Sequence, residues 1–120
     1  MAADSRFSIP RESLQGIDTF PLQLTGIEHF WLWDDTSQFS KRFRVALQFV
    51  GTIDWNAWYE TLRLAVSWQP MIVALLNSSK PLQLVIPTDP AIRVCWGKGD
   101  FGTSPFESAM DLTKEAGLRI

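Results

Sequence analysis

The chain has 120 residues, of which 46% are hydrophobic and 20% charged, and its formal net charge at pH 7 is −2. This length predicts a single domain, and the apolar content excludes an intrinsically disordered chain. The charge argues against nucleic-acid binding, which needs clustered Lys and Arg, and no apolar run is long enough to span a membrane. Cys95 is the only cysteine, which excludes an internal disulfide. We expect a cytoplasmic protein.

The first part of the chain shows no periodic pattern. Residues 1–19 mix Ser, Arg, Pro, Glu and Gly with scattered apolar residues. We therefore predict an N-terminal arm over residues 1–19 and a folded unit over residues 20–120. Within that unit, Thr25 and Glu28 have the spacing of a capping box, which predicts a short helix that ends near Trp33.

A strand and a helix are predicted in the middle of the chain. Apolar residues alternate with others over residues 43–50, which is the pattern of a strand with one buried face. Gly51 breaks that pattern, and Asp54 stands where the N-cap of a helix belongs. An apolar stripe with helical spacing follows over residues 55–69, and Pro70 ends the predicted helix.

The remaining patterns predict further strands. Two apolar runs, residues 71–76 and 82–86, flank a polar turn and indicate a hairpin. Residues 92–96 alternate as another strand, and Gly117-Leu118-Arg119-Ile120 has the character of a strand beginning. The predicted fold is α/β, a mixed and largely antiparallel sheet with the long helix packed on one face.

Taken in order, four stretches resemble the N-terminal part of condensation-type acyltransferases. Phe20-Pro21-Leu22-Gln23-Leu24-Thr25 resembles the family's opening x-P-L-T, and residues 43–51 with Ile53-Asp54 are similar to its first long strand and G-x-L/I-D turn. Residues 55–68 with Gln69-Pro70-Met71-Ile72 look like its long helix and closing R-H-P-L-L. Met110-Asp111-Leu112 and Gly117-Leu118-Arg119-Ile120 resemble its F-D-L … G-P-L-L-R. The chain departs from this pattern at Trp68-Gln69, where the family usually has Arg-His, and at Val73, where a second Arg is common.

The resemblance implies a chloramphenicol acetyltransferase-like fold, of which this chain is the N-terminal part. The family, which includes the condensation domains of nonribosomal peptide synthetases, transfers an acyl group from a coenzyme A or phosphopantetheine thioester to an amine or hydroxyl. Its catalytic His-His-x-x-x-Asp-Gly would lie after residue 120, so we expect a truncated, non-catalytic portion that supplies scaffold and one wall of a channel. We expect no catalytic, cofactor-binding or metal-binding residue in the chain and predict no acyl transfer by it alone.

For three other features of the sequence, a structural role is favoured over a chemical one. His29 is the only histidine, which excludes a pair of histidine ligands, and a surface or packing role is favoured. Cys95 alternates within an apolar strand, which favours a buried small hydrophobe over a nucleophile. Residues 97–102 spell G-x-G-x-x-G, but no helix with an apolar stripe follows, so we predict a loop rather than a dinucleotide site.

The tryptophans leave two interpretations open. Trp31 and Trp33 on the first predicted helix, with Trp55, Trp58 and Trp68 on the second, are either core residues or part of a hydrophobic channel or partner surface. The expected partner is the remainder of an acyltransferase domain, or a second copy of the chain joined through the edge at residues 117–120. The alternative function is a stand-alone α/β module that binds a protein partner, or an acyl or lipid ligand.

Overall fold

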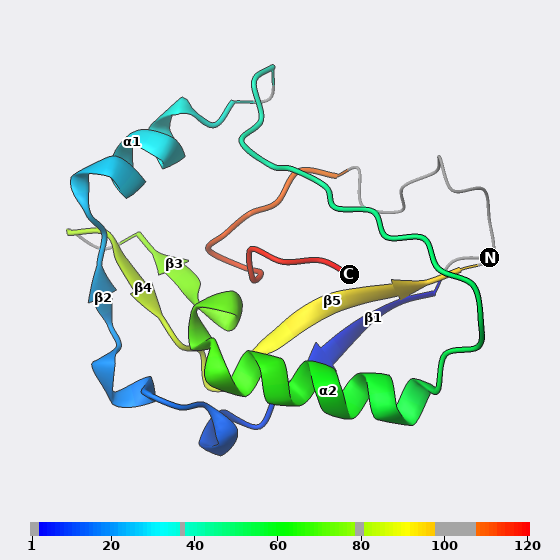
Figure 1. Cartoon of the computed structure of the whole chain (residues 1–120). Helices are drawn as coiled ribbons and strands as arrows, with labels where there is room; N and C mark the ends of the chain where they lie inside the picture. Colours follow the sequence, from blue (N-terminus) through cyan, green and yellow to red (C-terminus); the bar gives the residue numbers. More distant parts are fainter. Residues whose placement is uncertain (1–2, 37, 79–80, 98–107) are drawn as a thin grey trace.

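The computed structural model describes residues 3–36, 38–78, 81–97 and 108–120 of the chain (Figure 1). Within these ranges the fold is mixed α/β, as the sequence predicts, with antiparallel sheets and two α-helices. The helices are α1 (Gly26–Asp34) and α2 (Trp55–Trp68). The strands are β1 (Ala3–Ser8), β2 (Leu22–Gln23), β3 (Leu75–Asn77), β4 (Gln83–Val85) and β5 (Ala91–Trp96).

Both helices begin at the residues that the sequence predicts. At α1, the backbone N–H of Glu28 donates to the Thr25 hydroxyl at 3.4 Å, and the Glu28 carboxylate accepts from the Thr25 N–H at 2.6 Å. At α2, the Asp54 carboxylate accepts from the N–H groups of Asn56 and Ala57, at 3.0 and 3.2 Å. These bonds satisfy N–H groups that a helix leaves unpaired at its first turn.

The main core lies between α2 and a two-stranded antiparallel sheet. β1 pairs with β5 from Ala3 opposite Trp96 to Ser8 opposite Ala91, and Figure 1 shows α2 running beside this pair. Buried side chains from both strands, from α2 and from the 3₁₀ helix η3 (Pro70–Val73) form the core. They include Phe7, Ile9, Val66, Val73, Ile92 and Val94.

The structure corrects the predicted N-terminal arm. Residues 3–8 form β1, Ile9 is only 2% exposed, and the N–H of Ile9 donates to the Pro90 carbonyl at 2.8 Å. These residues therefore belong to the core. The partner strand β5 lies more than eighty residues later in the chain, and the short alternation of Phe7 and Ile9 gives no sign of that pairing by itself.

The predicted hairpin is confirmed, and it belongs to a second small sheet. β3 and β4 pair antiparallel, from Leu75 opposite Val85 to Asn77 opposite Gln83. β2 joins the other side of β4 and gives the order β2-β4-β3. The first half of the run at residues 71–76 is not strand, because Pro70 opens η3 (Pro70–Val73) directly after α2.

The predicted strand over residues 43–50 is wrong. Figure 1 shows an extended connection between α1 and α2 that carries no strand arrow, and no hydrogen bond joins the backbone of residues 43–50 to another part of the described chain. Its large apolar side chains are 66% to 103% exposed: Phe43, Val45, Leu47, Phe49 and Val50. The alternation suits a strand, but a strand also needs a neighbour that supplies donors and acceptors. We call residues 43–50 the open segment.

The last residues of the chain lie along β5. Arg119 forms an isolated parallel bridge with Arg93, the N–H of Ile120 donates to the Arg93 carbonyl at 3.0 Å, and Cys95 N–H donates to the Ile120 carbonyl at 2.7 Å. The sequence predicts the beginning of a strand at residues 117–120, and the structure has a single isolated bridge there. Neither helix in the described ranges has the length and apolar character needed to cross a membrane.

Candidate functional site

The tryptophans singled out from the sequence lie in different surroundings. Trp31 and Trp33 are exposed on α1, and Trp68 is exposed at the end of α2. The Lys41 ammonium lies 5.6 Å from the centre of the Trp31 ring and pairs with the Asp34 carboxylate at 2.6 Å. Trp58 is half-buried and packs against the main core.

Trp58 belongs to an aromatic cluster that joins α2 to β5. Ring centres of Trp55, Trp58 and Tyr59 lie 4.2, 5.1 and 5.9 Å from that of Trp96, all in edge-to-face orientation. Tyr59 also stacks on Phe7 of β1 at 5.0 Å. Such pairs contribute about 0.5–1.5 kcal/mol each beyond the area they bury. The cluster therefore fixes α2 on the β1–β5 pair, and Trp96 is a member that the sequence pattern does not single out.

The other candidate residues lie apart from one another. His29 is exposed on α1, and Cys95 lies partly buried on β5. Among the described residues, no group of three or more His, Cys, Asp or Glu side chains is arranged to hold a metal ion. Of the G-x-G-x-x-G run at residues 97–102, all but Gly97 lies outside the described residues.

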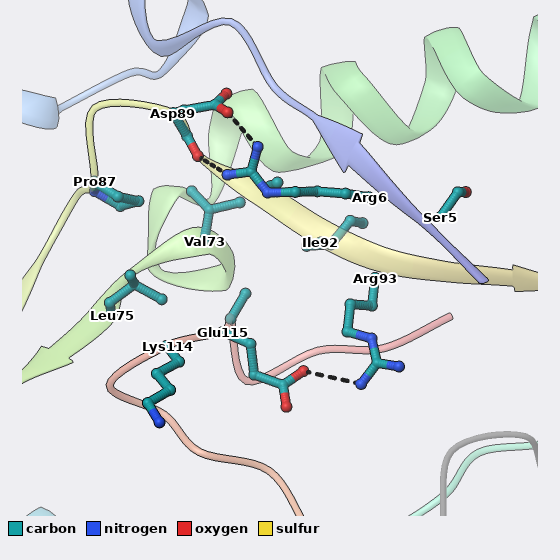
Figure 2. Close-up of a pocket in the computed structure, with 12 residues that line it drawn as sticks. Ser5, Arg6, Val73, Leu75, Pro87, Asp89, Ile92, Arg93, Lys114 and Glu115 are labelled. Atoms are coloured by element: carbon teal, nitrogen blue, oxygen red, sulfur yellow. Dashed lines mark hydrogen bonds and ion pairs between the residues drawn. The ribbon is translucent and has the colours of Figure 1, made fainter. Parts of the chain in front are cut away.

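A pocket beside β1 and β5 brings together residues that no pattern in the sequence connects. It has a volume of about 370 Å³ and is lined by residues from β1, β5, the end of η3, the 87–89 loop and residues 114–116 (Figure 2). Val73, Ile92 and Ala116 form a buried apolar floor, at 0%, 1% and 3% exposure. Because its lining comes from segments far apart in the chain, no local motif could have indicated this pocket.

Charged side chains surround the apolar floor. Arg6, Arg93 and Lys114 are basic, and Asp89 and Glu115 are acidic. Figure 2 shows Arg6 hooked toward Asp89 on one side of the pocket, while Arg93 and Glu115 approach each other on the opposite side, at 3.8 Å. The guanidinium of Arg6 contacts both the carboxylate and the backbone carbonyl of Asp89.

Glu115 is held most strongly by a side chain that does not line the pocket. Arg119 donates to both carboxylate oxygens, with its Nε 2.9 Å from Oε2, and the Arg119 side chain is only 5% exposed. The hydrogen bonds from Arg119, with a smaller contribution from the charge of Arg93, hold the pKa of Glu115 below its ordinary value. Glu115 is therefore ionised at neutral pH, and its charge is shared between two guanidinium groups.

The floor and the charges together define what the pocket can do chemically. Guanidinium groups present planar forks of N–H donors that match a carboxylate. Within the described residues, the lining offers neither a histidine nor a cysteine, so the visible chemistry is recognition by charge and apolar contact. Comparison of the chain with protein-family models, with curated proteins and with solved structures gave no significant match.

Proposed function

We propose that this chain is the non-catalytic N-terminal portion of a condensation-type acyltransferase-like protein, to which it contributes scaffold and one wall of a channel. The observation that carries this proposal is the open segment. Its alternating side chains suit a sheet, yet its backbone pairs with no other described segment and its apolar residues face solvent. A further strand from the remainder of such a protein would supply hydrogen-bond partners for this backbone, and the same remainder would cover its apolar side chains.

The arrangement around the open segment is compatible with that proposal. Gly51 follows it with φ of +134°, a conformation that favours glycine, and Asp54 caps α2 three residues later. The proposed order of strand, glycine turn and capped helix matches the order of the family motifs that the sequence resembles. We propose that the complete protein has a chloramphenicol acetyltransferase-like fold, with α2 as the long helix on one face of its sheet.

We further propose that this portion contributes no catalytic side chain to acyl transfer. His29, the only histidine in the sequence, is exposed on α1 beside Glu28, whose carboxylate already accepts from the Thr25 N–H. In the complete protein, the thioester donor, either coenzyme A or a carrier-protein phosphopantetheine, would be used by a histidine encoded after residue 120. The donor and the acceptor would then be bound only when both portions are present.

A second candidate function is a binding module that acts without such a remainder. The observation that favours it is the exposed apolar surface of α1, formed by Ile27, Phe30, Trp31 and Trp33. An apolar surface of this kind is typical of a site for a protein partner or a lipid-like ligand. Tryptophan fluorescence titration with acyl-coenzyme A and fatty acids tests it, and a flat titration at high ligand concentration would exclude the lipid version.

The test of the first proposal combines sequence and activity. The genomic reading frame should continue beyond residue 120 and encode His-His-x-x-x-Asp-Gly within a few tens of residues. The purified 120-residue chain should transfer no acetyl group from acetyl-coenzyme A to amine or hydroxyl acceptors. Turnover by this chain that disappears in His29→Ala would overturn the proposal.

A further inference from the structure

We propose that the pocket beside β1 and β5 binds a small organic carboxylate that carries a short apolar chain. The pocket is that of Figure 2, with its floor of Val73, Ile92 and Ala116 and its charged surround. This inference concerns a different part of the molecule from the open segment, and it does not depend on any role in acyl transfer.

The apolar part of the ligand is indicated by the floor. Val73, Ile92 and Ala116 are almost fully buried and belong to the main core, so core packing fixes their positions. A ligand that lies on this floor would bury its own apolar surface without ordering a loop, which keeps the entropic cost of binding low. Leu75 and Pro87 extend the apolar lining beyond the buried floor.

The charged side chains that line the pocket indicate that the ligand carries a carboxylate. Three basic side chains and two acidic ones line the pocket, and each carboxylate is already in contact with a guanidinium group. Glu115 is further neutralised by Arg119, which lies outside the lining. Lys114 in turn pairs with the Asp111 carboxylate at 3.6 Å, so four basic and three acidic side chains leave a net charge of +1 around the pocket. An anion is favoured, whereas a cation would have to displace Arg6 or Arg119 from its carboxylate partner.

The size of the pocket limits the ligand. Ligand pockets have volumes of roughly 300–1,000 Å³, and this pocket, at about 370 Å³, lies near the lower limit. That volume suits a monocarboxylate with a few methylene groups rather than a nucleotide or a long acyl chain. Each methylene placed on the floor should tighten binding by about 0.8 kcal/mol, which is about fourfold.

The experiment compares three ligands of matched shape on the unmodified 120-residue chain. Isothermal titration calorimetry should detect hexanoate, while hexanamide and hexylamine should bind at least tenfold more weakly. Butyrate, pentanoate and hexanoate should show a rise in affinity of about fourfold per methylene. Equal binding of hexanamide and hexanoate, affinity independent of chain length, or no hexanoate binding would each overturn the proposal.

Two substitutions in the pocket lining, together with amide chemical shifts, test where hexanoate binds. Arg93→Gln should weaken hexanoate binding about tenfold, and Lys114→Gln, at an exposed position, should weaken it by less. Arg63→Gln is the matched control, since Arg63 lies on α2 outside the pocket lining and pairs with Glu60. If Arg93→Gln fails to fold, amide chemical shifts of the parent chain decide the question. Hexanoate should perturb residues 91–93 and 114–116, and perturbation confined to α1 would overturn the proposal.

Discussion

The indole Nε1 of Trp96 donates a hydrogen bond of 2.6 Å to the hydroxyl of Tyr59, and this bond joins β5 to α2 inside the aromatic cluster. Both groups are partly shielded from water, so removal of the Tyr59 hydroxyl would leave the indole N–H without its acceptor. We predict that Tyr59→Phe lowers the free energy of unfolding by about 1–2 kcal/mol, measured by urea denaturation.

The matched control for that variant is Trp96→Phe in the Tyr59→Phe background. The two residues contact each other, so their effects should not add, and a double-mutant cycle should give a coupling energy of at least about 0.5 kcal/mol. A coupling energy of zero would show that the hydrogen bond does not stabilise the α2–β5 contact.

The pairing of Glu115 with Arg119 predicts a pH dependence of stability. Hydrogen bonds from Arg119 lower the pKa of Glu115 in the folded chain, and in the unfolded chain this pKa returns to its ordinary value. The folded state thus holds this proton less tightly than the unfolded state. The stabilisation is complete above the unfolded pKa and is lost as the pH falls through the lower folded pKa.

Glu115→Gln should therefore be less stable than the parent at pH 7, and the difference should shrink as the pH falls below about 4. Chemical denaturation at several pH values measures this difference. Glu60→Gln is the control, because Glu60 forms an exposed pair with Arg63 that should contribute little. A stability difference for Glu115→Gln that stays constant with pH would contradict the assignment.

The Asp54 cap makes a separate prediction about α2. Asp54→Ala removes the acceptor of the Asn56 and Ala57 N–H groups and should cost about 0.5–2 kcal/mol of stability. Asp54→Asn keeps a side-chain oxygen at the same position and should retain most of that stability. Thermal unfolding followed by far-UV circular dichroism distinguishes the two variants, and equal melting temperatures would argue against a stabilising cap.

The open segment should tolerate charge in this chain. Leu47 is 78% exposed, so Leu47→Lys should change the free energy of unfolding by less than about 0.5 kcal/mol. Ile92→Ala, in the buried core, should cost about 2–5 kcal/mol in the same urea titration. A large loss of stability in Leu47→Lys would mean that Leu47 is buried in solution, and that the segment already has a partner.

Local signals in the sequence predicted the local features of the fold. Thr25 and Asp54 were recognised as caps because a cap depends on residues within one helical turn. The pairing of β3 with β4 is also predictable, since the two strands are only a few residues apart in the chain. The strand over residues 92–96 was found from its alternation and matches β5 within one residue.

Features that depend on distant residues were missed. The sequence predicts an arm where β1 lies because the partner strand β5 is remote in the chain. It predicts a strand over residues 43–50 because alternation reports side-chain preference but not the presence of a neighbour. The pocket could not be predicted for the same reason. The approach of Arg6 to Asp89 and of Arg93 to Glu115 exists only after β1, β5 and residues 114–116 have come together.

The open segment pairs with no other segment of the described residues, and we propose that it becomes a strand only in a longer acyltransferase-like protein. Amide hydrogen exchange tests this proposal most directly, with the 120-residue chain compared against that extended protein. Amides of residues 43–50 should exchange rapidly in the chain and at least a hundredfold more slowly in the extended protein, while the amides of β5 stay protected in both. Protection of residues 43–50 in the 120-residue chain, or no gain of protection in the extended protein, would contradict the account.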